Sequence, residues 1–155
     1  MRPVESHVYR LAMACCWAAF AWLFAFEVGP VVESAAAPIR ARQTVEVVER
    51  TEQRLCWRWS SVKLRPAISD NIDLFIVAAG DRLVGAPFFR ETGMPWRLSG
   101  TVGAGPQSIV MCALLPPHLG RDAPVRIEQV IQYRGWHDLW PVLVRVPDVM
   151  WTGSP

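Results

Sequence analysis

An uncharged and almost wholly apolar run near the N-terminus constrains this chain more than any other feature. Residues 11–26 form sixteen consecutive positions without a charge, a Pro or a Gly. A helix on the surface of a soluble domain would show polar residues at every third or fourth position, so the run predicts a membrane-targeting helix. Arg2 and Arg10 precede it, and Glu27 follows it. The positively charged flank predicts a cytoplasmic N-terminus and an exported C-terminal part.

The sequence leaves two fates open for this helix. Residues 11–26 alone span about 24 Å, whereas residues 8–28 span about 31 Å and match a hydrocarbon core of ~30 Å. We therefore expect a transmembrane helix or signal-anchor over residues 8–28, with residues 1–7 in the cytoplasm. The alternative is signal-peptide cleavage after Ala36, within a stretch of small residues. Ala36 lies ten residues past Phe26, which is late for a cleavage site and favours the uncleaved anchor.

The chain changes character after the apolar run. Residues 29–42 hold small residues, Pro and two Arg, a composition that predicts a spacer. From residue 43 onward apolar residues alternate with polar ones, which is typical of strands with one buried face. The expected strands are residues 43–50, 54–64, 71–79, 82–89, 96–102, 107–115, 125–134 and 139–146.

Short strands separated by turns that contain Gly and Pro predict the fold class. We expect a mostly β protein in which the N-terminal transmembrane helix precedes a small antiparallel β-sandwich, or a small barrel, over residues 43–148. Residues 149–155 are expected to form a C-terminal tail. Gly80 and Asp81 lie between two apolar runs and predict a two-residue hairpin loop with a type II′ turn.

Cys56 and Cys112 are the two cysteines of the expected exported domain. Outside the cytoplasm such a pair is expected to form a disulfide, and two buried free thiols are the alternative. Closing the loop between them would stabilise the fold by about 4 kcal/mol through the entropy of the unfolded chain. The pair, with Trp57 beside it, resembles the inter-sheet bridge of immunoglobulin-like sandwiches. This resemblance implies a sandwich that is immunoglobulin-like in outline.

The composition excludes some classes of function. Sixteen basic and fourteen acidic side chains give a net charge of +2, which is too small for a dedicated nucleic-acid binder. The sequence has no C-x-C, C-x-x-C or H-x-x-x-H spacing for a metal, and no Ser lies in a G-x-S-x-G motif. We therefore expect no catalytic residue, no metal and no cofactor, and we keep an envelope hydrolase as the third alternative.

Two aromatic clusters stand out as candidates for buried or binding residues. Trp57 and Trp59 alternate along a predicted strand, so we expect both indoles in the core. The segment 133–141 is richer in aromatics and contains Arg134. Trp and Arg are enriched among the residues that dominate protein interfaces, so we interpret this segment as a binding rim, with burial in the core or contact with lipid headgroups as alternatives. The candidate partner-binding residues are Arg134, Trp136, His137 and Trp140.

Together these patterns predict a protein of the bacterial envelope. We expect a single pass through the inner membrane, with the C-terminal domain in the periplasm. The domain would act as a protein-binding or assembly subunit of a bacterial or phage envelope complex. Its expected partners are the membrane and another protein, but not nucleic acid. A secreted soluble binding domain, released by cleavage, is the alternative.

Overall fold

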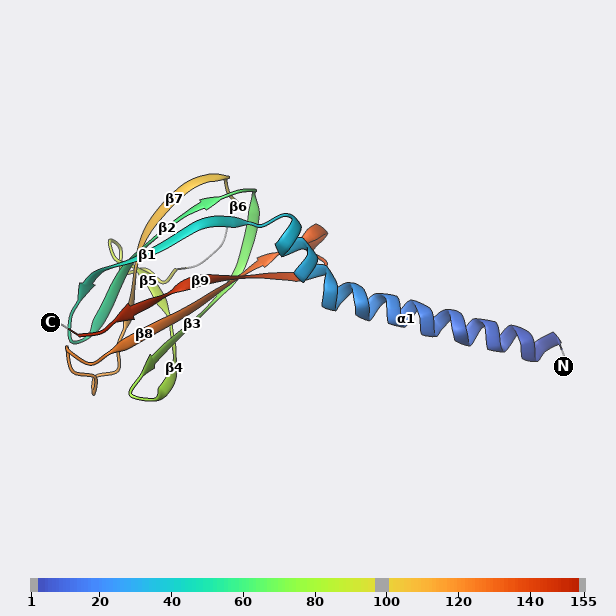
Figure 1. The fold of residues 1–155 in the computed structure, drawn as a ribbon, viewed down its shortest axis with the longest axis horizontal. Helices are drawn as coiled ribbons and strands as arrows, with labels where there is room; N and C mark the ends of the chain where they lie inside the picture. Colours follow the sequence, from blue (N-terminus) through green and yellow to red (C-terminus); the bar gives the residue numbers. More distant parts are fainter. Residues whose placement is uncertain (1–2, 97–100, 154–155) are drawn as a thin grey trace.

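A long N-terminal helix projects from a β-sandwich (Figure 1). The structure is a computed structural model, and it describes residues 3–96 and 101–153. Helix α1 covers Pro3–Ala36 and continues through Pro30. Residues 29–36, which we expected in an irregular spacer, are therefore the last turns of α1. Ala is the strongest helix former, and contacts with the sandwich hold these turns in place.

Two antiparallel sheets form the sandwich. The first sheet has the strand order β1 (Arg40–Arg50), β2 (Arg54–Lys63), β7 (Gly105–Leu114), β5 (Pro87–Phe89). The second has the order β4 (Asp81–Gly85), β3 (Ala67–Ala78), β8 (Val125–Arg134), β9 (Pro141–Trp151), and β6 (Thr101–Val102) pairs with the start of β3. The prediction of a mostly β chain, with a helix before an antiparallel sandwich, is confirmed.

The two sheets are connected differently at their two sides. On one side β1 lies beside β9, and Gln43 Nε2 donates a hydrogen bond of 3.2 Å to the carbonyl oxygen of Arg145. On the other side the chain passes directly from β4 to β5. Residues 82–89, which we expected as one strand, are thus divided between the sheets at Ala86. Pro87 has no N–H to donate, and it begins an edge strand, where a Pro is tolerated.

The β3–β4 hairpin has its loop one residue earlier than expected. Ala78 pairs with Asp81, so the loop consists of Ala79 and Gly80. Their φ angles are 52° and 91°. Positive φ at both positions indicates a type I′ turn, instead of the predicted type II′ turn.

Several strands extend beyond their predicted bounds, and β3 begins at Ala67 instead of residue 71. β9 runs to Trp151, so residues 149–151, which we expected in a tail, belong to the second sheet. The predicted strand 96–102 falls partly on residues 97–100, which lie outside the described part of the chain.

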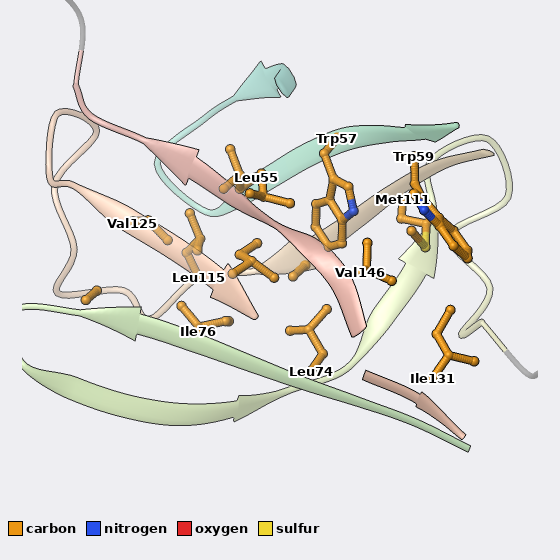
Figure 2. Packing of buried hydrophobic residues seen from close by; sticks show 14 of the residues in the cluster. Leu55, Trp57, Trp59, Leu74, Ile76, Met111, Leu115, Val125, Ile131 and Val146 are labelled. Atoms are coloured by element: carbon orange, nitrogen blue, oxygen red, sulfur yellow. The ribbon is translucent and has the colours of Figure 1, made fainter. Parts of the chain in front are cut away.

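The hydrophobic core lies between the two sheets and is centred on two indoles of β2. Trp57 and Trp59 are both buried. Figure 2 shows the Trp57 ring pointing toward Leu74 and Val146 of the opposite sheet. The prediction that both Trp residues belong to the core is confirmed.

The predicted disulfide between Cys56 and Cys112 is present. It joins β2 to its neighbour β7, where the two cysteines are direct register partners, with 4.0 Å between their Cα atoms. The inter-sheet bridge implied by the immunoglobulin-like resemblance is therefore wrong. Leu55 and Trp57 point into the core, so Cys56 between them faces the outer side of its sheet and meets a cysteine of the same sheet.

We predict different stability effects for two Trp substitutions. Trp57→Ala should lower the free energy of unfolding by about 3–5 kcal/mol, because it leaves a cavity in the core. Trp136→Ala should have little effect, because Trp136 is 59% exposed. Thermal unfolding of both variants in detergent micelles, followed by near-ultraviolet circular dichroism, measures the difference. A Trp136→Ala protein that melts as early as Trp57→Ala would contradict this prediction.

Candidate functional site

The end of α1 and the sandwich meet at the carboxylate of Glu33. Its Oε2 atom accepts hydrogen bonds from the backbone N–H of Trp136, at 2.8 Å, and from Nε1 of Trp140, at 2.7 Å. Its Oε1 atom forms an ion pair with Nη2 of Arg65. The Glu33 side chain is only 11% exposed. We call these four residues the junction.

Arg65 extends the junction to the chain that leaves the helix. Its Nε donates to the carbonyl oxygen of Ala37 at 3.1 Å, just after the end of α1. The N–H of Leu64 donates to the carbonyl oxygen of Ile39 at 2.8 Å. The exit of the helix is thus tied to the end of β2, and residues 37–39 are held by backbone and side-chain bonds.

Two glycines permit the close contact between helix and sandwich. A Cβ on Gly135 would lie 2.6 Å from Cδ1 of Trp140 and 2.8 Å from Oε2 of Glu33, so no larger residue fits without displacement. A Cβ on Gly29 would lie 3.1 Å from three ring atoms of Trp140. The Trp140 indole therefore packs directly on the helix backbone.

The loop between β8 and β9 contacts helix α1 directly. We call residues 135–140 the junction turn. It contains the 3₁₀-helix η1 (Trp136–Asp138), and the N–H of Gly135 donates to the carbonyl oxygen of Trp140 at 2.8 Å. This bond closes the turn, while the N–H of Trp136, at the start of η1, is satisfied by Glu33.

The structure brings together the residues predicted to bind a partner. Trp136 is exposed, whereas Trp140 is partly buried against α1, and the two ring centroids are 6.1 Å apart. Arg134 forms an ion pair with Asp70 at 2.7 Å, beside an open cavity of about 350 Å³. The backbone of His137 lies in η1, but its side chain is outside the described part of the structure. That these residues bind a protein stays a prediction.

Sequence reasoning missed a cationic cluster next to the junction. Arg40, which we expected in the spacer, is the first residue of β1. Its Nε donates to the hydroxyl of Tyr133 at 2.6 Å, and its Nη1 donates to Ser61 Oγ at 2.6 Å and Gln107 Oε1 at 2.9 Å. The guanidinium carbon also lies 4.3 Å from the ring centroid of Trp59, within the range of a cation–π contact.

Burial changes the titration of the groups around Arg40. Burial raises the pKa of Tyr133, although the hydrogen bond and charge of Arg40 act in the opposite direction. Burial lowers the pKa of Lys63, and the nearby charge of Arg40 lowers it further. Nζ of Lys63 donates to the carbonyl oxygen of Ala67 at 2.8 Å. These two basic side chains from β1 and β2 fill the end of the sandwich nearest the helix.

A separate apolar cavity lies beside edge strand β5. The hairpin after β5 is closed by a hydrogen bond of 3.0 Å from the N–H of Phe89 to the carbonyl oxygen of Met94. The cavity is open, has a volume of about 600 Å³ and is lined by Phe89, Glu91, Thr92, Met94 and Pro95.

Comparison with known proteins gives no family: no family and no curated protein matches the chain. Within residues 3–96 and 101–153, no group of three or more His, Cys, Asp or Glu side chains is placed to hold a metal ion.

We predict that Glu33 holds the junction turn against the helix. Glu33→Ala removes the acceptor for Trp136 N–H, Trp140 Nε1 and Arg65, and an unsatisfied buried donor costs about 1–3 kcal/mol. The backbone N–H of Trp136 should therefore exchange with deuterium about tenfold faster or more, because local opening becomes easier. Hydrogen–deuterium exchange of the full chain, resolved to the junction turn, measures this change.

Glu27→Ala is the matched control, because Glu27 is an exposed acid on the same helix. It should leave the exchange rate of Trp136 unchanged. An unchanged rate in Glu33→Ala as well would show that another contact holds the turn.

Proposed function

We propose that this chain is a single-pass membrane protein that keeps α1 and presents its β-sandwich outside the cytoplasm. The sandwich would act as a protein-binding or assembly subunit of a bacterial or phage envelope complex. The observation that carries this proposal is the junction, because Glu33 of the apolar helix completes the hydrogen bonding of the sandwich.

The apolar helix supports a membrane location. Residues His7–Ala36 are long and apolar enough to cross a bilayer, and the most apolar part is not covered by the rest of the chain. Trp17, Phe20, Trp22 and Phe24 are all exposed along it. Contiguous apolar surface of this extent is rare on soluble monomers, whereas a lipid environment would cover it.

The junction also favours an uncleaved helix over a secreted domain. Cleavage after Ala36 would remove Glu33 and leave Arg65 without this carboxylate. It would also expose the Trp140 face that packs on Gly29. A domain released in this way would lose contacts that its own turn is shaped to make.

The same contacts suggest how the protein would present its sandwich. A flexible spacer would let the domain sweep a large volume, whereas α1 continues as a helix into the junction. The sandwich is then held at a set distance and orientation from the bilayer. A fixed orientation relative to the membrane suits a subunit that binds other membrane-bound components in one geometry.

The apolar cavity beside β5 is the surface that best supports protein binding. Phe89, Met94 and Pro95 supply apolar contact area, and Glu91 and Thr92 add polar atoms, a mixture found at protein interfaces. Phe89 pairs with Met111 of β7, six residues along the strand from Gly105. At about 3.4 Å per residue this places the cavity roughly 20 Å from the end of β7 near the helix, within reach of a partner beside the membrane.

We expect alkaline phosphatase fused after Pro155 to be active and the mature protein to retain α1. The charge-free run and the positive flank before it predict this orientation. Phosphatase assays, with a green fluorescent protein fusion at the same place as the control, measure the topology. Intact-protein mass spectrometry of the membrane fraction measures retention. A mature N-terminus at Ala37 would support the secreted alternative, and an inactive phosphatase with a bright fluorescent fusion would overturn the orientation.

We further expect a protein partner to contact the cavity beside β5. A photo-crosslinking amino acid in place of Met94 should give a discrete protein adduct in native membranes. The same amino acid in place of Val84, which is exposed on the edge strand β4, is the matched control and should give none. Adducts from position 136 but not from position 94 would move the partner to the junction turn.

A further inference from the structure

The junction turn carries exposed apolar side chains at the end of the sandwich nearest the helix. Trp136 is 59% exposed and Leu139 is 42% exposed. Figure 1 shows this turn as the part of the sandwich that reaches farthest along α1 toward the N-terminus. The turn therefore lies beside the helix at the point where the apolar run ends.

The depth of the turn follows from the helix geometry. The middle of residues 11–26 falls between Ala18 and Ala19, and Gly29 lies ten to eleven residues farther along α1. At a rise of about 1.5 Å per residue, Gly29 is roughly 16 Å from the middle of the run. Half of the hydrocarbon core is ~15 Å thick. The Trp140 ring, which packs on Gly29, is thus at the boundary between acyl chains and headgroups.

The orientation of Trp140 agrees with this depth. The atoms Cη2, Cζ2 and Cζ3 of its six-membered ring face Gly29. Its Nε1 donates to Glu33, one helical turn closer to the sandwich. The apolar ring therefore lies on the side of the hydrocarbon, and the N–H points away from it, toward the carboxylate of Glu33. Indoles at membrane interfaces are oriented in the same way, with the apolar ring toward the acyl chains and the polar end away from them.

We propose that the junction turn rests in the lipid headgroup layer, so that the sandwich contacts the membrane directly through Trp136 and Leu139. This inference rests on the proposed membrane anchorage. The occupant of the surface is lipid because α1 itself sets the turn at the edge of the bilayer. A single transmembrane helix can tilt in the bilayer together with the domain fixed to it, and a second contact beside the helix opposes that tilt.

Spin labels on the full chain test the contact. We would attach a nitroxide to Leu139→Cys in a Cys15→Ala, Cys16→Ala background, because these two cysteines are free. The protein is reconstituted in phosphatidylcholine vesicles. We expect the ratio of collisions with oxygen to collisions with a water-soluble nickel complex to be several-fold higher at position 139 than at Val84→Cys, whose native side chain is 83% exposed on β4. Trp136→Cys, labelled in the same way, should agree with position 139.

A label at Phe20→Cys separates the two possible failures. If position 20 is deep in the bilayer while positions 136 and 139 are as accessible to nickel as position 84, the lipid contact is wrong and the anchor stands. If position 20 is itself accessible to nickel, the membrane anchorage fails. A label at position 139 that is water-accessible in vesicles but shielded in native membranes would assign the surface to a protein and overturn the lipid contact.

Discussion

The carboxylate of Glu33 is the interaction on which the arrangement of helix and sandwich depends. A carboxylate with so little exposure is costly unless its oxygens are filled with donors. Here Trp136 and Trp140 fill one oxygen and Arg65 pairs with the other. Such bonds are directional, so they set the rotation of α1 as well as its position. A shift of one residue would turn the carboxylate by about 100° around the helix axis and away from all three donors.

The hydrogen bonds of Arg40 connect the start of β1, just after the junction, to both sheets. Arg40 starts the first strand after α1, and its guanidinium donates to side chains on β2, β7 and β8. It also stacks over Trp59, which belongs to the core. The first strand is thereby attached to both layers within four residues of the end of the helix. The Cys56–Cys112 bond then ties β2 to β7 farther along the same sheet. Covalent and polar contacts thus link the helix to strands far apart in the sequence.

The sequence predicted the parts of this structure that depend on local periodicity. Alternation along β2 placed Trp57 and Trp59 in the core, and the export signal justified pairing Cys56 with Cys112. It could not predict that the bond stays within one sheet, because periodicity gives the face of a strand but not its neighbours. The role of Glu33 could not be predicted from the sequence either, because its partners on the junction turn lie 103 and 107 residues away along the chain. An acid among small residues and Pro has the composition of a solvated spacer, and only the tertiary fold reveals its donors.

The orientation of Trp140 sets the position of Glu33 along α1. If the acid stood one turn earlier, near Gly29, its side chain would meet the six-membered ring of Trp140 instead of the indole N–H. If it stood one turn later, it would lie beyond Ala36 and outside α1. The indole of Trp140 bridges these limits, because its ring reaches Gly29 while its N–H reaches Glu33. A single side chain thus spans one turn of α1, from the backbone of Gly29 to the carboxylate of Glu33. In the proposed membrane arrangement, this indole sets how close the sandwich lies to the bilayer.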